Sequence, residues 1–106
     1  MMNQTVLVGR IVSDPQINET ENKKVTTMKI AVTRCYKNEE GIYETDFIPV
    51  VLWNGIAENV CEYCQKGDLI AVKGRIESNE DRIEVIAEKV TFLSSRRPEQ
   101  NESANN

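Results

Sequence analysis

Short runs of β-branched and aliphatic residues alternate with polar turn sequences along most of the chain. Each run has the length and composition of a β-strand. The polar sequences between them, such as Ser-Asp-Pro and Asn-Glu-Glu-Gly, are typical of turns. The pattern predicts five strands, over Thr5–Val12, Val25–Thr33, Thr45–Trp53, Asp68–Ile76 and Arg82–Phe92.

One segment has helical rather than strand periodicity. Between Ile56 and Gln65 the apolar residues recur at the spacing of a helix face. Asn54 is in a position to cap the first turn, and Gly67 is placed where a left-handed residue ends a helix. The sequence therefore predicts one helix between the third and fourth strands.

The predicted order is three strands, one helix and two strands. This is the order of the OB-fold, a partly open, five-stranded Greek-key barrel. We therefore expect an all-β OB-fold barrel with one α-helix over residues 1–94, and a five-stranded sandwich is the weaker alternative. Residues 95–106 contain no aromatic or large aliphatic residue, so they are expected to form a short disordered tail.

Composition indicates a globular protein and excludes several classes. The 106 residues are 40% hydrophobic and 28% charged, which is ordinary for one folded domain. No apolar run approaches the roughly 18 residues of a membrane span, and no secretory signal is visible at the N-terminus. We therefore expect a cytoplasmic protein without membrane contacts.

Residues that commonly carry catalysis are missing. The chain has no histidine, so the commonest general base and metal ligand is absent. Cys61 and Cys64 lie inside the predicted helix and have no second ligand pair, so neither a redox nor a zinc site is expected. There is also no glycine-rich phosphate-binding loop. We predict no catalytic residue, no cofactor and no metal, and hence a protein that is not an enzyme.

The third predicted strand has two different faces. Because side chains alternate along a strand, Ile48, Val50 and Leu52 share an aliphatic face that is expected to face the core. The opposite face carries Phe47, Pro49, Val51 and Trp53. In an OB-fold this strand belongs to the binding surface, where exposed aromatic residues stack on the bases of single strands. The competing interpretation is that the helix or a partner subunit buries this face.

Tyr36 extends the aromatic set. It closes the second predicted strand between Arg34 and Lys37, at the entrance of the loop that leads into the third strand. An aromatic residue flanked by two cations suits base stacking beside phosphate contacts, whereas a half-exposed tyrosine between two solvated charges is the alternative. We predict base stacking by Tyr36, Phe47 and Trp53.

Basic residues occupy predicted outer positions on several strands. In the fourth strand Ile70, Val72 and Ile76 are expected to face the core, and Lys73 and Arg75 alternate with them. Such an arrangement suits a groove along a phosphate backbone, although surface lysines also protect strand edges. The net charge of −4 counts against a nucleic-acid partner only modestly, because it does not describe the local potential of a groove. The predicted phosphate contacts are Arg10, Lys29, Arg34, Lys37, Lys73 and Arg75.

From about Asn3 to Leu93 the chain resembles the bacterial single-stranded DNA-binding protein (SSB) family. The segments that carry the resemblance are Asn3–Ile11 with Asp14-Pro15, Thr45–Trp53 with Ala57-Glu58, Lys66–Asp68 and Val72–Ile76. The resemblance implies sequence-nonspecific binding of single-stranded DNA, in replication, recombination or repair, with stacking at Tyr36, Phe47 and Trp53. It also implies a nucleoid-associated homo-oligomer that pairs through its first strand, a tetramer in preference to a dimer.

Two features depart from the family pattern. The connection Glu77–Asp81 is shorter than the family's long hairpin and lacks its stacking aromatic, so we expect a smaller DNA footprint. The chain ends without an acidic tip closed by an apolar residue, which argues against recruitment of replication or repair enzymes through such a tip. Both features leave open a primosome-type OB-fold adaptor, similar to the primosomal replication protein N family, which forms dimers and acts mainly through protein contacts.

Overall fold

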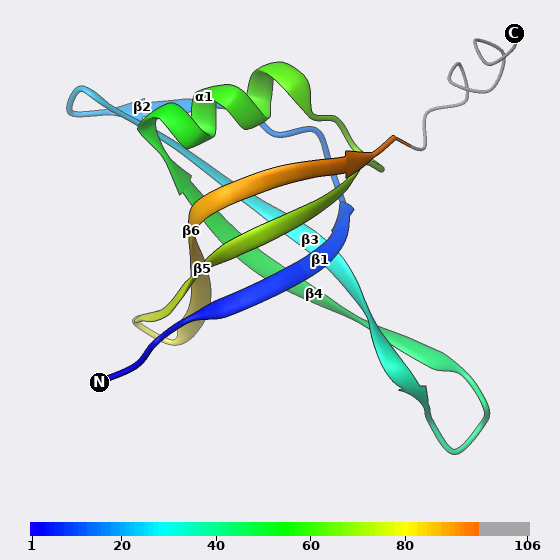
Figure 1. The fold of residues 1–106 in the computed structure, drawn as a ribbon. Coiled ribbons are helices and arrows are strands. Elements are labelled where there is room, and N and C mark those ends of the chain that lie inside the picture. The colour runs from blue at the N-terminus through cyan, green and yellow to red at the C-terminus, as the bar shows by residue number, and fades with distance from the viewer. Residues whose placement is uncertain (96–106) are drawn as a thin grey trace, which may run out of the picture.

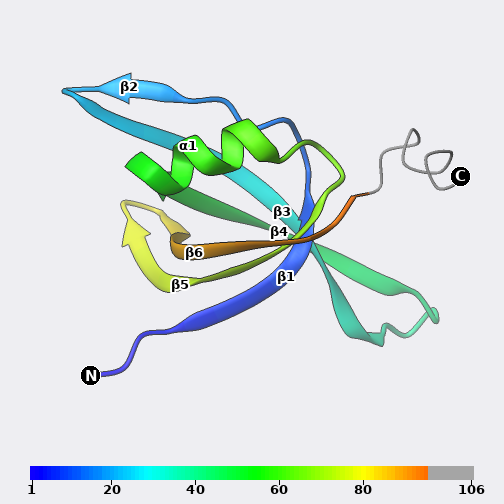
Figure 2. The ribbon, with the colours of Figure 1, turned by 45° about the horizontal axis from the view of Figure 1, so that its top comes forward.

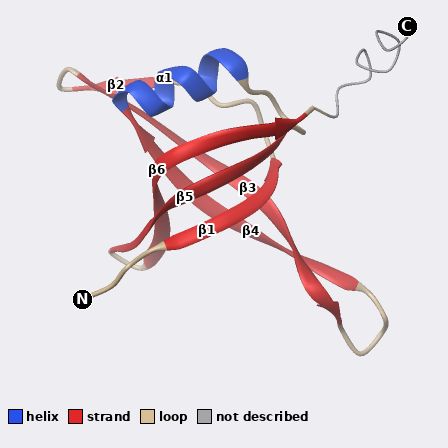
Figure 3. Ribbon diagram, in the orientation of Figure 1, coloured by secondary structure: helices blue, strands red, loops and turns tan. Residues whose placement is uncertain are grey.

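The computed structural model describes residues 1–95 and contains, within them, six strands and one helix. The elements are β1 (Thr5–Ile11), β2 (Asn18–Thr20), β3 (Lys23–Lys37), β4 (Tyr43–Trp53), α1 (Asn54–Tyr63), β5 (Leu69–Asn79) and β6 (Arg82–Ser94). The strands curve into a barrel, and α1 lies across one end (Figures 1 and 3). The predicted tail, residues 95–106, lies outside the described residues except for Ser95.

Hydrogen bonds join the strands in the order β1-β5-β6-β4-β3-β2, and an additional pairing of β1 with β3 closes the barrel. β1 makes this closing contact at Arg10 and Ile11, after pairing with β5. β4 and β6 are parallel where Val50 pairs with Val85. A parallel pair needs a long crossover, which here consists of α1 and β5. The prediction of an OB-fold barrel is confirmed, and the sandwich alternative is wrong.

The core contains the inward side chains of the strands and one face of the helix. Val50 and Leu52 are fully buried, and Ile48 packs against them with partial exposure, as the alternation in β4 predicted. From α1, Ala57 and Val60 close the end of the barrel. Removing these apolar surfaces from water is the main stabilising contribution. The buried core residues are Ile11, Met28, Ile30, Val50, Leu52, Ala57, Val60, Cys64, Ile70, Val72, Val85 and Ala87.

The helix begins and ends earlier than predicted, at Asn54 and Tyr63, and no side chain caps its first turn. Asn54 has a φ of 51° and its Oδ1 accepts a hydrogen bond from the backbone N–H of Lys24, 3.2 Å away. Asn54 therefore links α1 to β3 instead of capping the helix. Gly67 has the predicted positive φ, but it lies beyond the helix, where its N–H donates to the carbonyl of Ile11 at 2.8 Å.

Two hairpins extend from the barrel (Figure 2). The β2–β3 hairpin lies beside α1, and the β3–β4 hairpin extends on the opposite side of the barrel. The three-residue β2 lies within a segment predicted to be a turn and pairs with the start of β3. At the far end β3 continues past the predicted boundary at Thr33, and Lys37 pairs with Tyr43 after an irregularity in register. We call residues 33–45 the distal arm. Most of its side chains are exposed, so the arm has no burial pattern from which its length could be predicted.

The hairpin between β5 and β6 is tighter than predicted. Asn79 pairs with Arg82, so that only two residues form the turn. Ile76, expected in the core, is 45% exposed because β5 has left the barrel at this point. The strand changes register beside Gly74, where an added Cβ would lie 2.0 Å from the carbonyl oxygen of Ile86. Glycine therefore permits the close approach that directs the hairpin away from the core.

Candidate nucleic-acid interface

The outer face of β3 and β4 displays Phe47 and Trp53. Their alternation with Val50 and Leu52 directs them away from the core, and their side chains are 58% and 42% exposed. At about 3.3 Å per residue the two aromatic residues are roughly 20 Å apart along β4, which is enough for several stacked bases. The helix does not bury either of them. The cross-strand pairs on this face are Ala31–Phe47, Lys29–Pro49, Thr27–Val51 and Val25–Trp53.

The part of this face between the two aromatic residues is not open. Val51 was predicted to lie on the outer face, but it is buried because it pairs with Ile86 of β6 and the β5–β6 hairpin folds over it. This overlap forms a groove of about 390 Å³ with Trp53 in its wall, which we call the Trp53 groove. It is lined by Val25, Thr27, Val51, Trp53, Glu77, Ser78, Asn79, Arg82, Glu84 and Ile86.

Tyr36 lies in the irregular part of the distal arm rather than on the regular face. It is exposed, and the register of β3 against β4 shifts between Thr33 and Lys37. Tyr43, by contrast, lies four residues before Phe47 in β4, so the alternation of side chains places it on the same face, where it is exposed. Lys37 Nζ lies 5.7 Å from the centre of the Tyr43 ring, within range of a cation–π contact. Sequence reasoning missed Tyr43, although the alternation along β4 could have identified it.

Arg34 is held by two carboxylates of β4. Its Nε and Nη2 donate to the two carboxylate oxygens of Asp46 at 3.0 and 2.8 Å, and its Nη1 donates to Glu44 at 2.7 Å. The hydrogen bonds and charge of Asp46 raise the pKa of Arg34, and the guanidinium in turn lowers the pKa of Asp46. The charge of this predicted phosphate contact is thus compensated within the chain.

Arg75 is compensated in the same way. Its Nε donates to Glu77 at 2.9 Å and its Nη1 donates to Glu88 at 3.2 Å. The hydrogen bonds to Glu77 and Glu88 raise the pKa of Arg75. Ion pairs at exposed sites contribute little net stability. Their main effect here is to reduce the positive charge that β5 offers to a ligand.

The other predicted cations differ in position. Lys29 lies on the aromatic face opposite Pro49, and no ion pair involves it within residues 1–95. Arg10 is partly buried and donates from Nη1 to the carbonyl of Gly67 at 3.0 Å. Lys73 is on β5, which β6 separates from β4 in the sheet. The structure therefore brings Lys29 close to the aromatic face and does not bring Lys73 there.

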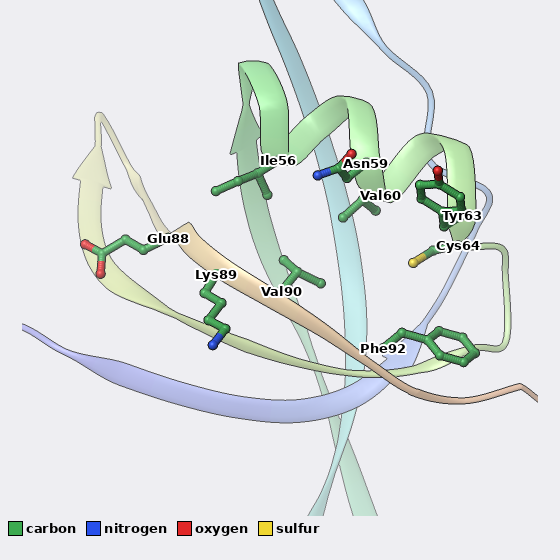
Figure 4. Close-up of a pocket in the computed structure, with 9 residues that line it drawn as sticks. All are labelled: Ile56, Asn59, Val60, Tyr63, Cys64, Glu88, Lys89, Val90 and Phe92. Atoms are coloured by element: carbon green, nitrogen blue, oxygen red, sulfur yellow. The ribbon is translucent and has the colours of Figure 1, made fainter.

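A second groove, of about 450 Å³, lies between α1 and β6 (Figure 4). Its lining is mainly apolar, with Tyr63 and Phe92 near one end and Glu88 and Lys89 toward the other. None of the predicted stacking or phosphate-binding residues lines it. It is therefore separate from the aromatic face.

Two further expectations concern metals and membranes. Among residues 1–95 there is no group of three or more side chains suited to hold a metal ion. Cys64 is part of the core, and Cys61 Sγ lies 3.3 Å from Thr26 Oγ1, so both cysteines pack between the helix and the barrel. In the same part of the chain no helix combines the length and the apolar character needed to cross a membrane.

An OB-fold barrel that exposes aromatic residues on β3 and β4, with a lysine between them, defines a class of single-stranded nucleic-acid-binding modules. Comparison with known families agrees with this class. The model of the single-strand binding protein family matches residues 2–93, and the chain belongs to this family.

Relatives with similar sequences carry the same designation. The chain is 42% identical to the single-stranded DNA-binding protein of Bacillus cereus, in a match that covers 91% of this chain and 62% of that protein. It is 42% identical to the single-stranded DNA-binding protein 3 of Listeria innocua, over 91% of this chain and 66% of that protein. The chain is 39% identical to the single-stranded DNA-binding protein B of Bacillus subtilis, in a match that covers 91% of this chain and 94% of that protein. The chain therefore spans less than two thirds of the first two relatives.

Proposed function

We propose that the chain binds single-stranded DNA without sequence preference, and that it protects and organises this DNA in replication, recombination or repair without catalysing a reaction. The observation that carries the proposal is the exposure of Phe47 and Trp53 on the outer face of one strand of an OB-fold barrel. Every base offers a flat π-face, so stacking on these rings tolerates any sequence. This function belongs in the cytoplasm, at the nucleoid.

We infer that Phe47 and Trp53 stack on bases and that Tyr36 adds a stack on the distal arm. Lys29 and Lys37 are the cations best placed for phosphate contacts beside these rings, because neither is in an ion pair within residues 1–95. The remaining proposed phosphate contacts are Arg10, Arg34, Lys73 and Arg75. Arg34 and Arg75 would have to exchange a carboxylate for a phosphate.

Titration of intrinsic fluorescence with poly-dT, at low and at high salt, tests the proposal. Trp53 is the single tryptophan of the chain, so it reports directly on the proposed stacking position. We expect strong quenching that weakens as salt is added, because DNA binding releases counterions. Absence of quenching, together with absence of binding in a mobility assay, would refute DNA binding and favour the primosome-type adaptor. The names of the relatives support DNA binding over that adaptor.

We also propose that the chain is a homo-oligomer, a tetramer in preference to a dimer. One edge of β1 pairs with β5, but its other edge pairs only at Arg10 and Ile11 within residues 1–95. Val6 and Val8 are exposed on the same strand. An unpaired strand edge with apolar side chains is a template for pairing with a second chain, and this supports assembly through β1.

A further inference from the structure

The Trp53 groove has polar as well as apolar walls. Trp53, Val25 and Val51 supply its apolar side, and the β5–β6 hairpin supplies Glu84 on the other side. Glu84 is only 6% exposed although it is ionisable. Such a buried carboxylate normally has strong partners.

The partner of Glu84 is weak. Within residues 1–95, its one polar contact is with Arg82 Nη2 at 3.4 Å, and the side chain of Arg82 is mostly exposed. Charge-assisted hydrogen bonds are normally about 2.7–2.9 Å long. The carboxylate of Glu84 therefore retains capacity to accept a hydrogen bond from a ligand in the groove.

The chemistry of the groove selects which part of a DNA strand enters it. Glu77, Glu84 and Arg82 are the ionisable residues that line the groove, and Glu77 lies directly across the hairpin from Glu84 and is paired with Arg75. The lining therefore offers a phosphate no net positive charge, and the carboxylate of Glu84 repels it. An uncharged nucleobase meets no such repulsion, and Trp53 offers it a stacking surface. The occupant that fits the groove is thus a base, with the phosphates kept outside.

We propose that the Trp53 groove binds one nucleobase and favours a base with an exocyclic amino group over thymine, because Glu84 accepts a hydrogen bond from that amino group. This inference rests on the proposed function. A carboxylate has no proton to donate, so it pairs well with the amino group of cytosine, as in other protein–DNA contacts. Thymine offers a carboxylate only its N3–H, which lies between two carbonyl oxygens that the carboxylate repels. The chain would therefore bind DNA of any sequence but with a bias against thymine at this position.

The test compares binding of oligo-dC and oligo-dT, two pyrimidine polymers, to the parent protein and to Glu84→Gln at neutral pH. Glutamine has the same shape but can also donate to a carbonyl oxygen. We expect the ratio of dC to dT affinity to fall by about five- to tenfold in Glu84→Gln, because a neutral amide oxygen accepts a weaker hydrogen bond from cytosine than a carboxylate does. The matched control is Glu62→Gln, which removes the same charge from an exposed position on α1, outside the Trp53 groove, and should leave the ratio unchanged.

A second measurement leaves the protein intact. An oligonucleotide of 2-pyrimidinone, which lacks the amino group of cytosine, should bind the parent at least about tenfold more weakly than oligo-dC. Equal dC-to-dT ratios in the parent and Glu84→Gln, with no loss for 2-pyrimidinone, would overturn base selection while leaving DNA binding intact. If no oligonucleotide binds the parent, the proposed function itself is wrong.

Discussion

Phe47 and Trp53 are exposed to solvent, although burying them in the core would stabilise the fold. Burying a large apolar side chain is worth about 1.5–3 kcal/mol, yet Phe47 stays 58% and Trp53 42% exposed on a barrel that has an apolar core. Their exposure is what the proposed base-stacking surface requires. At the same scale, Arg34 and Arg75 show that a basic residue on an outer position is not always available to a ligand, because carboxylates already bind both of them.

Phe47→Ala should weaken poly-dT binding by about 1–3 kcal/mol, which is the usual loss for one base-stacking aromatic residue. Because Phe47 is 58% exposed, its removal should change the melting temperature little. Quenching of Trp53 fluorescence measures the affinity, and circular dichroism measures the melting. Tyr63→Ala, which removes an exposed aromatic residue from α1, is the matched control and should bind like the parent. Parent-like affinity of Phe47→Ala would exclude stacking at this position.

At the scale of elements, the distal arm is joined across its two strands by side chains. Arg34 of β3 bridges Asp46 and Glu44 of β4, next to the irregularity in register. The arm extends beyond the barrel and has few buried side chains, so these ion pairs are among its few cross-strand contacts outside the backbone. The arm also carries Tyr36, so its order affects where that ring lies.

The pH dependence of Asp46 tests this bridge. Arg34 lowers the pKa of Asp46 in the folded state, so the ion pair stabilises the fold above the unfolded pKa of about 3.9. That contribution is lost as the pH falls through the lower folded-state pKa. A carbon NMR titration of the Asp46 carboxyl should show a low midpoint in the parent and a rise toward the ordinary value in Arg34→Gln.

The matched control for this titration is Arg75→Gln, which removes an arginine from a separate ion-pair cluster. It should leave the midpoint of Asp46 unchanged. The same midpoint in the parent and in Arg34→Gln would show that the bridge does not persist in solution.

At the scale of the whole molecule, residues 1–95 form a closed barrel that leaves most of one edge of β1 without a strand partner. β1 is paired by β5 along one side, and only its last residues contact β3. Proteins usually protect such an edge with charged residues, but β1 carries the exposed side chains of Val6 and Val8. Within residues 1–95 no strand covers most of this edge, which suits the proposed pairing with another copy.

Val8→Lys should reduce the molecular mass measured in solution, because a charged side chain on an exposed strand opposes strand pairing. The parent should have the mass of four chains, as measured by light scattering after size exclusion. Ile83→Lys, on the exposed β5–β6 hairpin, is the control and should retain the mass of the parent. A monomeric parent, or an unchanged mass in Val8→Lys, would contradict assembly through β1.

Much of the architecture could be predicted from local sequence pattern. Alternation with a period of two identified the strands, the burial of Val50 and Leu52, and the exposure of Phe47 and Trp53. These features are local, because neighbouring side chains of a strand must point to opposite faces. The order of strands and helix then limited the fold to few alternatives. Alternation failed for Ile76, because β5 itself leaves the barrel there, and for Val51, because the β5–β6 hairpin covers the outer face of β4 at that position.

The remaining features depend on strand register, which joins residues that are distant in sequence. Arg34 meets Asp46 only because β3 and β4 align as they do, and Asn54 bonds to Lys24 instead of capping α1 for a similar reason. Glu84 comes to line a groove with Trp53 only when the β5–β6 hairpin folds over β4. The sequence by itself determined the elements and their two faces, since those follow from local alternation. Only the tertiary structure decided which charges are free and which side chains share a groove, because those depend on contacts between strands.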